Sequence, residues 1–125
     1  MKKNELITMA MFEALKSNMY HKHGAIIIHR NKIIGRGHNY SIGERRMKNG
    51  RWSIHAEMNA IYDCNDHSII SEATLYVVRI SPMFINDVNS ENFCFKPHIH
   101  TKESKPCSKC QKALDKLRIT RIWHT

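Results

Sequence analysis

Long apolar runs, internal repeats and low-complexity segments are missing from this sequence. Nothing in its 125 residues approaches the ~20 consecutive apolar residues that a membrane-spanning helix needs. Lys2 and Lys3 stand near the start, but Glu5 and Glu13 interrupt the residues after them, so the apolar core of a secretion signal is absent. With 42% hydrophobic and 25% charged residues, the chain has the composition of a soluble globular protein. We expect one domain over residues 1–125 and no membrane partner.

Acidic residues and cysteines are also few. The chain has 20 Lys and Arg against 11 Asp and Glu, a formal net charge of +9. Such an excess favours an anionic partner, either a nucleotide or a nucleic acid, although a basic solvated surface would give the same count. Two of the four cysteines, Cys107 and Cys110, fall in a metal-ligand motif, and the others are Cys64 and Cys94. This usage argues against a disulfide framework and predicts a reducing, cytoplasmic location.

His55, Cys107 and Cys110 have the residue types of a zinc site. H-x-E at residues 55–57 is a weak motif by itself, and so is P-C-x-x-C at residues 106–110. Together, in this order, they form the signature of zinc-dependent nucleobase deaminases. Three protein ligands leave one tetrahedral position open, which is typical of a catalytic zinc, whereas a purely structural zinc would need a fourth protein ligand. The sequence predicts one catalytic Zn²⁺ ion.

Glu57 is the only acidic residue in either motif. Zinc lowers the pKa of water to about 7 and so supplies a hydroxide, which in a deaminase attacks C4 of cytosine or C6 of adenine. A carboxylate beside the metal can carry the protons that this reaction moves. The alternative is an ordinary acid in the first turn of a helix. We expect both motifs to open helices, with Pro106 near the start of the second one, so that helix N-termini stabilise the thiolates and Glu57.

Five segments carry a resemblance to a known family. They are Gly24–Ile28, Gly37–Asn39, His55–Ile61, Leu75–Val78 and Ser104–Cys110. The chain resembles the zinc-dependent cytidine/deoxycytidylate deaminase superfamily, and the continuation Met58–Ile61 most resembles its deoxycytidylate deaminase branch. This resemblance implies a three-layer α/β/α cytidine deaminase-like sandwich with a mixed central sheet. It also implies that the Asn39 side chain and the Ala56 backbone N–H contact the substrate.

The apolar pattern predicts the elements of such a fold. Helices are expected over residues 4–17, 56–65 and 107–117, and strands over 25–29, from 33 onward, over 73–80 and over 118–123. Residues 30–32 read as a hairpin turn, and residues 41–53 as a polar loop. The alternation of strands and helices indicates βαβ crossovers.

Two departures from the family pattern stand out. Residues 81–104 form a long insertion before the Pro-Cys motif, and we expect this segment to cover the site or to contact another subunit. The chain also stops after its fourth expected strand, where the family adds a helix and a fifth strand. A sheet truncated in this way would have an uncovered edge, which association into a homo-oligomer would protect.

Residues in the loop before His55 are further candidates for substrate contacts. Arg45, Arg46 and Arg51, in the loop before His55, suit a phosphate clamp, although a solvated basic loop is an equal alternative. Trp52 can stack on a base or simply pack. Cys94, His98 and His100 have the residue types for a second zinc, but surface histidines are the preferred interpretation.

We therefore predict a zinc-dependent hydrolase that converts a cytosine nucleotide of CMP or dCMP type to the uracil form and releases ammonia. One alternative is a nucleic-acid deaminase such as a tRNA adenosine deaminase. The other is a non-catalytic, zinc-bearing subunit that binds nucleotides or regulates a partner.

Overall fold

The computed structural model describes residues 2–43 and 52–125. Along the chain, the elements are α1 (Lys3–Ala14), β1 (Lys22–His29), β2 (Lys32–His38), β3 (Tyr40–Gly43), β4 (Trp52–Ile54), α2 (Ala56–Asp63), the 3₁₀ helix η2 (His67–Glu72), β5 (Thr74–Ile80), α3 (Pro82–Asp87), α4 (Pro97–His100), β6 (Thr101–Lys102), α5 (Ser108–Lys116) and β7 (Arg121–His124). Within the described ranges, no helix is both long and apolar enough to cross a membrane.

The central sheet is mixed, as the family resemblance implied. Its strand order is β2-β1-β5-β6, and β7 also pairs with β5. β1 runs antiparallel to β2 and β5, while β7 runs parallel to β5 after the crossover through α5. The turn between β1 and β2 consists of Arg30 and Asn31, whose φ angles of 49° and 63° are those of a two-residue hairpin turn.

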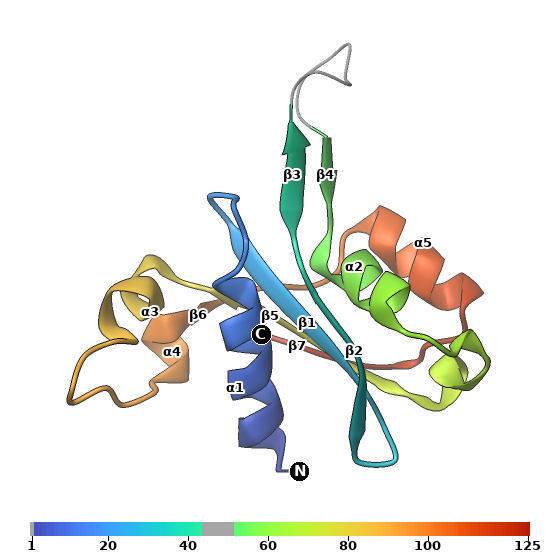
Figure 1. Ribbon diagram of the computed structural model, residues 1–125, viewed down its shortest axis with the longest axis horizontal. Coiled ribbons are helices and arrows are strands. Elements are labelled where there is room, and N and C mark those ends of the chain that lie inside the picture. Colours follow the sequence, from blue (N-terminus) through green and yellow to red (C-terminus); the bar gives the residue numbers. More distant parts are fainter. Residues whose placement is uncertain (1, 44–51) are drawn as a thin grey trace.

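Helices cover both faces of this sheet (Figure 1). α1 packs on one face, against Ile26 and Val78. α2 and α5 pack on the other face, against Ala25, Ile27 and Leu75. β1 is thus buried on both sides, which explains its uninterrupted apolar run. The three-layer α/β/α architecture inferred from the sequence is confirmed.

Two glycines of β2 bring α2 unusually close to the sheet. A Cβ atom on Gly35 would lie 2.4 Å from the carbonyl oxygen of Ala60, and one on Gly37 would lie 2.3 Å from the Ala60 nitrogen. Neither position can hold a larger side chain without displacing α2. Since His55 immediately precedes α2, these glycines help to set where His55 lies.

The prediction of a loop over residues 41–53 is wrong at both ends. β3 and β4 pair as an antiparallel hairpin, with Tyr40 opposite Ile54. Figure 1 shows this hairpin projecting away from the central sheet. Backbone pairing stabilises these polar residues as strands, although their sequence lacks an apolar alternation.

The insertion over residues 81–104 contains regular structure that the sequence interpretation missed. The Ser81 side chain accepts a hydrogen bond from the Phe84 N–H, and Pro82 occupies the first turn of α3. Pro97 opens α4 in the same way. Capping serine and N-terminal proline are helix-start signals, and both were present in the sequence.

His100 forms the centre of the folded insertion. Its side chain is 2% exposed, and the rings of Phe84, Phe93 and Phe95 surround it with centroids 5.9, 5.3 and 6.0 Å away. His100 Nδ1 accepts the Lys96 N–H, and Nε2 lies 3.2 Å from an Asp87 carboxylate oxygen. The expectation of a surface histidine is therefore wrong at this position, because the aromatic residues of the insertion bury the ring.

Candidate functional site

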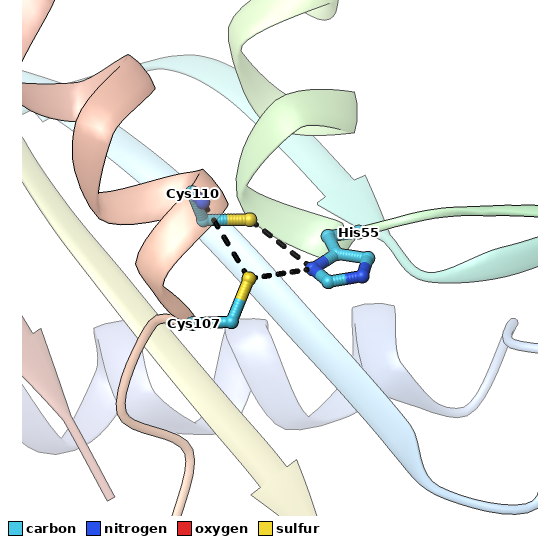
Figure 2. A group of neighbouring side chains, drawn as sticks. All are labelled: His55, Cys107 and Cys110. Carbon is cyan, nitrogen blue, oxygen red and sulfur yellow. Dashed lines mark hydrogen bonds between the residues drawn. The ribbon is translucent and has the colours of Figure 1, made fainter.

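His55, Cys107 and Cys110 meet at the starts of two neighbouring helices. His55 caps α2, Cys107 caps α5, and Cys110 lies in the first turn of α5. His55 Nδ1 is 3.1 Å from Cys110 Sγ and 3.5 Å from Cys107 Sγ (Figure 2). All three ligand atoms lie within 4.8 Å of one another. The structure thus brings together the three residues that the sequence assigned to zinc.

The donor set fits a zinc ion. Burial raises the pKa of the Cys110 thiol far above its usual range, and the neighbouring Glu57 and Cys107 raise it further. A thiolate at this position therefore needs a nearby cation, which a divalent metal supplies. Two thiolates and one imidazole nitrogen are ligands that zinc prefers. Among the described residues, no fourth His, Cys, Asp or Glu joins the group, so a coordination position is left open.

Cys94, His98 and His100 do not form a second ligand group within the described part of the chain. His100 has both ring nitrogens engaged inside the insertion. Cys94 is a free, exposed cysteine.

Glu57 lies beside the ligand group and is 5% exposed. Burial raises the pKa of its carboxyl group. Three other influences oppose burial and lower that pKa. They are a hydrogen bond from the backbone N–H of Glu57 itself, the neighbouring His55 and a hydrogen bond with Cys110. A carboxyl group held between such opposing influences is suited to both taking up and releasing a proton.

A cavity of about 850 Å³ opens beside these groups. This volume is in the range of small-molecule sites. The described residues that line it are Asn18, Met19, Tyr20, His21, His23, Asn39, Ser41, Ser53, His55, Ala56, Glu57, Ser104, Lys105 and Cys107. Of the predicted insertion, only Ser104 appears in that lining, so the described residues 81–103 do not cover the cavity.

Asn39 and Ala56 both reach the cavity, as the resemblance implied. The Asn39 side chain, however, already binds the backbone: Oδ1 accepts the His23 N–H at 2.8 Å, and Nδ2 donates to the His21 carbonyl at 2.6 Å. Asn39 therefore holds the chain where it enters β1, and its contact with a substrate remains a prediction. Ala56 is fully buried at the start of α2, and its small side chain keeps the cavity wall close to His55.

The predicted basic clamp lies outside the described residues. Arg45, Arg46 and Arg51 belong to the segment 44–51, and the side chain of Trp52 also falls outside the described part of the chain. Their assignment to phosphate or base contacts remains a prediction.

Sequence reasoning assigned no role to the segment between α1 and β1, which supplies Asn18, Met19, Tyr20 and His21 to the cavity. No pattern in this loop pointed there. His23 could have been found, because it alternates with Ala25 and Ile27 onto the face of β1 that packs against α2. Burial lowers the pKa of His23 to about 4, and the positive charge of Arg79 contributes to this shift. His23 is therefore neutral near pH 7.

Comparison with known proteins places this geometry in context. A family model described as "Cytidine and deoxycytidylate deaminase zinc-binding region" matches residues 1–125. A search of curated protein sequences gives no match.

Among solved structures, the dCMP deaminase from cyanophage S-TIM5 in complex with dCMP and dUMP is similar, with 18% identity and a TM-score of 0.64 over 99% of this chain and 82% of that chain. Its apo form has a TM-score of 0.66 at 18% identity, over 99% of this chain and 84% of that chain. Cytidine deaminase from Burkholderia pseudomallei has 17% identity and a TM-score of 0.60, over 95% of this chain and 79% of that chain. At these identities the structural matches establish the fold.

Proposed function

The chain belongs to the family of cytidine and deoxycytidylate deaminases and is a zinc-dependent hydrolase of a nucleobase amine, and from this premise we propose that its substrate is a free cytosine nucleotide. The reaction converts CMP or dCMP to the uracil form and releases ammonia. The observation that carries this proposal is a buried carboxylate, Glu57, in a cavity beside three zinc-type ligands. The nucleotides in the S-TIM5 complex support the choice of dCMP as a test substrate.

The residues of the cavity divide the chemistry among them. His55, Cys107 and Cys110 would hold the Zn²⁺ ion, which when bound would lower the pKa of water to about 7 and so supply the nucleophile. Glu57 takes one proton from the attacking water and delivers it to N3 of the cytosine ring. It then takes the second proton from the new C4 hydroxyl and passes it to the departing amine, which leaves as ammonia. Because Glu57 and His55 both lie at the start of α2, the carboxylate and the metal ligand keep a fixed spacing. Ala56 leaves room for the ring between them.

A nucleic-acid deaminase is the second candidate. The net charge of +9 supports it, and so does Tyr20, which is 87% exposed on the cavity wall. An exposed aromatic ring near a basic cavity can stack on a base of a single strand. A non-catalytic subunit is less well supported, because a scaffold does not need a buried carboxylate in contact with its metal ligands.

We also propose that the protein forms a homo-oligomer. Phe12 on α1 and both Met83 and Ile85 on α3 are 50%, 48% and 39% exposed. The Phe12 ring contacts the Phe84 ring of α3, so the exposed apolar side chains of α1 and α3 lie close to one another on the surface. Exposed apolar groups that gather in this way favour association. Light scattering after size exclusion measures the mass directly.

The test of the substrate is an ammonia-release assay on the zinc-loaded protein. Cytosine, cytidine, CMP, dCMP, AMP and short RNA and DNA oligonucleotides are compared, with Glu57→Gln as the matched inactive control. Turnover of CMP or dCMP that disappears in Glu57→Gln supports the proposal. Turnover only of oligonucleotides, or only of adenine compounds, contradicts it.

A further inference from the structure

Arg79 occupies the end of β5 on the face of the sheet that carries the candidate zinc site. It alternates with Leu75 and Val77, whose side chains pack in the core beneath α2 and α5. In the register of the sheet, Arg79 stands opposite His23 on β1 and opposite Lys102 on β6. Arg79 therefore lies beside the cavity wall to which His23 belongs.

The guanidinium of Arg79 contacts that wall directly. Arg79 Nη2 donates a hydrogen bond to His21 Nδ1 at 2.7 Å, and His21 lines the cavity. Since Nδ1 accepts this bond, the neutral His21 ring carries its proton on Nε2, which remains a donor. Tyr20 packs edge-on against the same ring, with centroids 4.9 Å apart. The hydrogen-bonded Arg79 and His21 side chains thus place N–H donors beside the cavity wall.

Arg79 is half-buried and yet lacks an acidic partner among the described residues. The four ion pairs found there join Lys16 and His38 to Glu13, His29 to Glu72, and His100 to Asp87. Arginine is seldom withdrawn from water without an anion beside it. Among the described residues, the side chain of Arg79 makes one hydrogen bond, to His21, and a guanidinium has five N–H donors.

Charge is unevenly distributed around the cavity. Glu57 is the one carboxylate among its described lining residues, and it lies at the ligand end. Lys105 supplies an exposed ammonium from the segment that leads into Cys107. His23 stands opposite Arg79 in the sheet and lines the same cavity as His55. The wall formed by His21, His23 and Lys105 therefore carries positive charge from Lys105 and, through its contacts with His21 and His23, from Arg79.

We propose that Arg79, His21 and Lys105 form an anion-binding subsite that receives the 5′-phosphate of a mononucleotide. This inference rests on the proposed function, because placing the amino-bearing carbon at the zinc directs the phosphate to the opposite end of the substrate. A guanidinium suits a phosphate because its planar fork donates two parallel hydrogen bonds. Its residues differ from Arg45, Arg46 and Arg51, which the sequence suggested as a phosphate clamp.

The test measures phosphate preference, defined as the kcat/KM for CMP or dCMP divided by that for the matching nucleoside. Arg79→Ala is expected to lower this ratio about 10- to 100-fold, the range for losing hydrogen bonds to a charged group. Arg79→Lys should fall between Arg79→Ala and wild type. Arg36→Ala is the matched control, because Arg36 is an exposed arginine of β2 that does not line the cavity. An equal loss on nucleotide and nucleoside in Arg79→Ala overturns the inference.

Titration with the products UMP and dUMP, against uridine and deoxyuridine, gives a readout that does not depend on turnover. Calorimetry of the zinc-loaded protein should show tighter binding of the monophosphates, and this advantage should shrink in Arg79→Ala and in Lys105→Ala. Zinc content and melting temperature of each variant establish that it is folded. If Arg79→Ala does not fold, the Lys105→Ala variant, at an exposed residue, tests the subsite by itself: unchanged binding of the monophosphates in this variant would contradict the proposal.

The outcomes separate the two proposals. If the protein turns over CMP or dCMP but Arg79→Ala and Lys105→Ala do not change the phosphate preference, the subsite is contradicted and the proposed function is supported. If UMP binds more tightly than uridine but no monomer is turned over, the subsite is supported and the proposed function is contradicted. Preference for oligonucleotides over monophosphates in both assays contradicts both.

Discussion

Ser104 and Thr125 are joined by hydrogen bonds that involve both their backbones and their side chains. The Ser104 N–H donates to the Thr125 carbonyl at 2.7 Å, the Thr125 N–H donates to Ser104 Oγ at 3.0 Å, and the two hydroxyls lie 2.8 Å apart. Ser104 Oγ also donates to the Val77 carbonyl of β5 at 2.9 Å. Ser104 shortly precedes Cys107, so this pair fixes the end of the chain, β5 and the approach to the metal ligands relative to one another.

Ser104→Ala is expected to destabilise the fold by about 1–3 kcal/mol, because buried partners lose their hydrogen bonds. Zinc affinity should fall with stability, since the segment before Cys107 loses its anchor. Urea unfolding and a zinc-chelator competition measure the two effects, with the exposed Ser71→Ala as control. An unchanged unfolding midpoint would show that the contact is dispensable.

Loss of either cysteine ligand should remove the metal. Purified protein is expected to hold one zinc ion per chain, whereas Cys107→Ala and Cys110→Ala should hold little. Because zinc binding and folding are coupled, the melting temperature should drop by at least about 4 °C, the shift that about 1 kcal/mol produces in a domain of this size. Cys94→Ala, at a free exposed cysteine, is the control. Wild-type protein free of zinc under non-chelating conditions would refute the metal assignment.

Glu57→Gln should retain zinc and fold but reduce turnover at least ~10²-fold, the low end for a general acid–base. The amide keeps the shape of the carboxyl group and cannot move the proton. Metal analysis and steady-state kinetics are compared with Glu91→Gln, an exposed acid in the insertion. Near-normal turnover in Glu57→Gln would assign the proton transfer to another group.

His23 should make the protein less stable in acid. Its pKa is lowered from 6.5 to about 4 in the folded chain. Between those values the unfolded chain binds a proton that the folded chain does not, so stability falls as the pH drops from 6.5 toward 4. Urea midpoints at pH 7 and pH 5 should therefore differ less in His23→Gln than in wild type. His98→Gln, at an exposed histidine, should behave as wild type. The same pH dependence in all three proteins would mean that His23 ionises normally.

The metal ligands could be predicted because chemistry restricts both their types and their local positions. Zinc favours thiolate and imidazole donors, and a histidine or cysteine at a helix start presents its side chain predictably. The layer order could be predicted for a similar reason: a strand that is apolar on consecutive positions, such as Ala25–Ile28, needs cover on both faces.

The cavity wall and the insertion could not be predicted in the same way. Asn18, Met19, Tyr20 and His21 reach the cavity only because the sheet and α1 carry their loop there, and no periodicity reports that placement. His100 looked solvent-exposed because polar and charged residues surround it in sequence. Its burial depends on three phenylalanines that approach it in space.

The insertion leaves β5 and returns to it at almost the same point. The Ser81 N–H bonds the His100 carbonyl at 2.9 Å, and β6 pairs with the last residues of β5. A segment whose two ends are pinned together can change length at little entropic cost, because loop closure depends only weakly on the number of residues inside. The phenylalanines of the insertion pack in the cluster beneath α1, on the other face of the sheet from α2 and α5. Exposed residues of the insertion such as Glu91 and Asn92 are therefore suitable splice points for a reporter domain or an affinity tag.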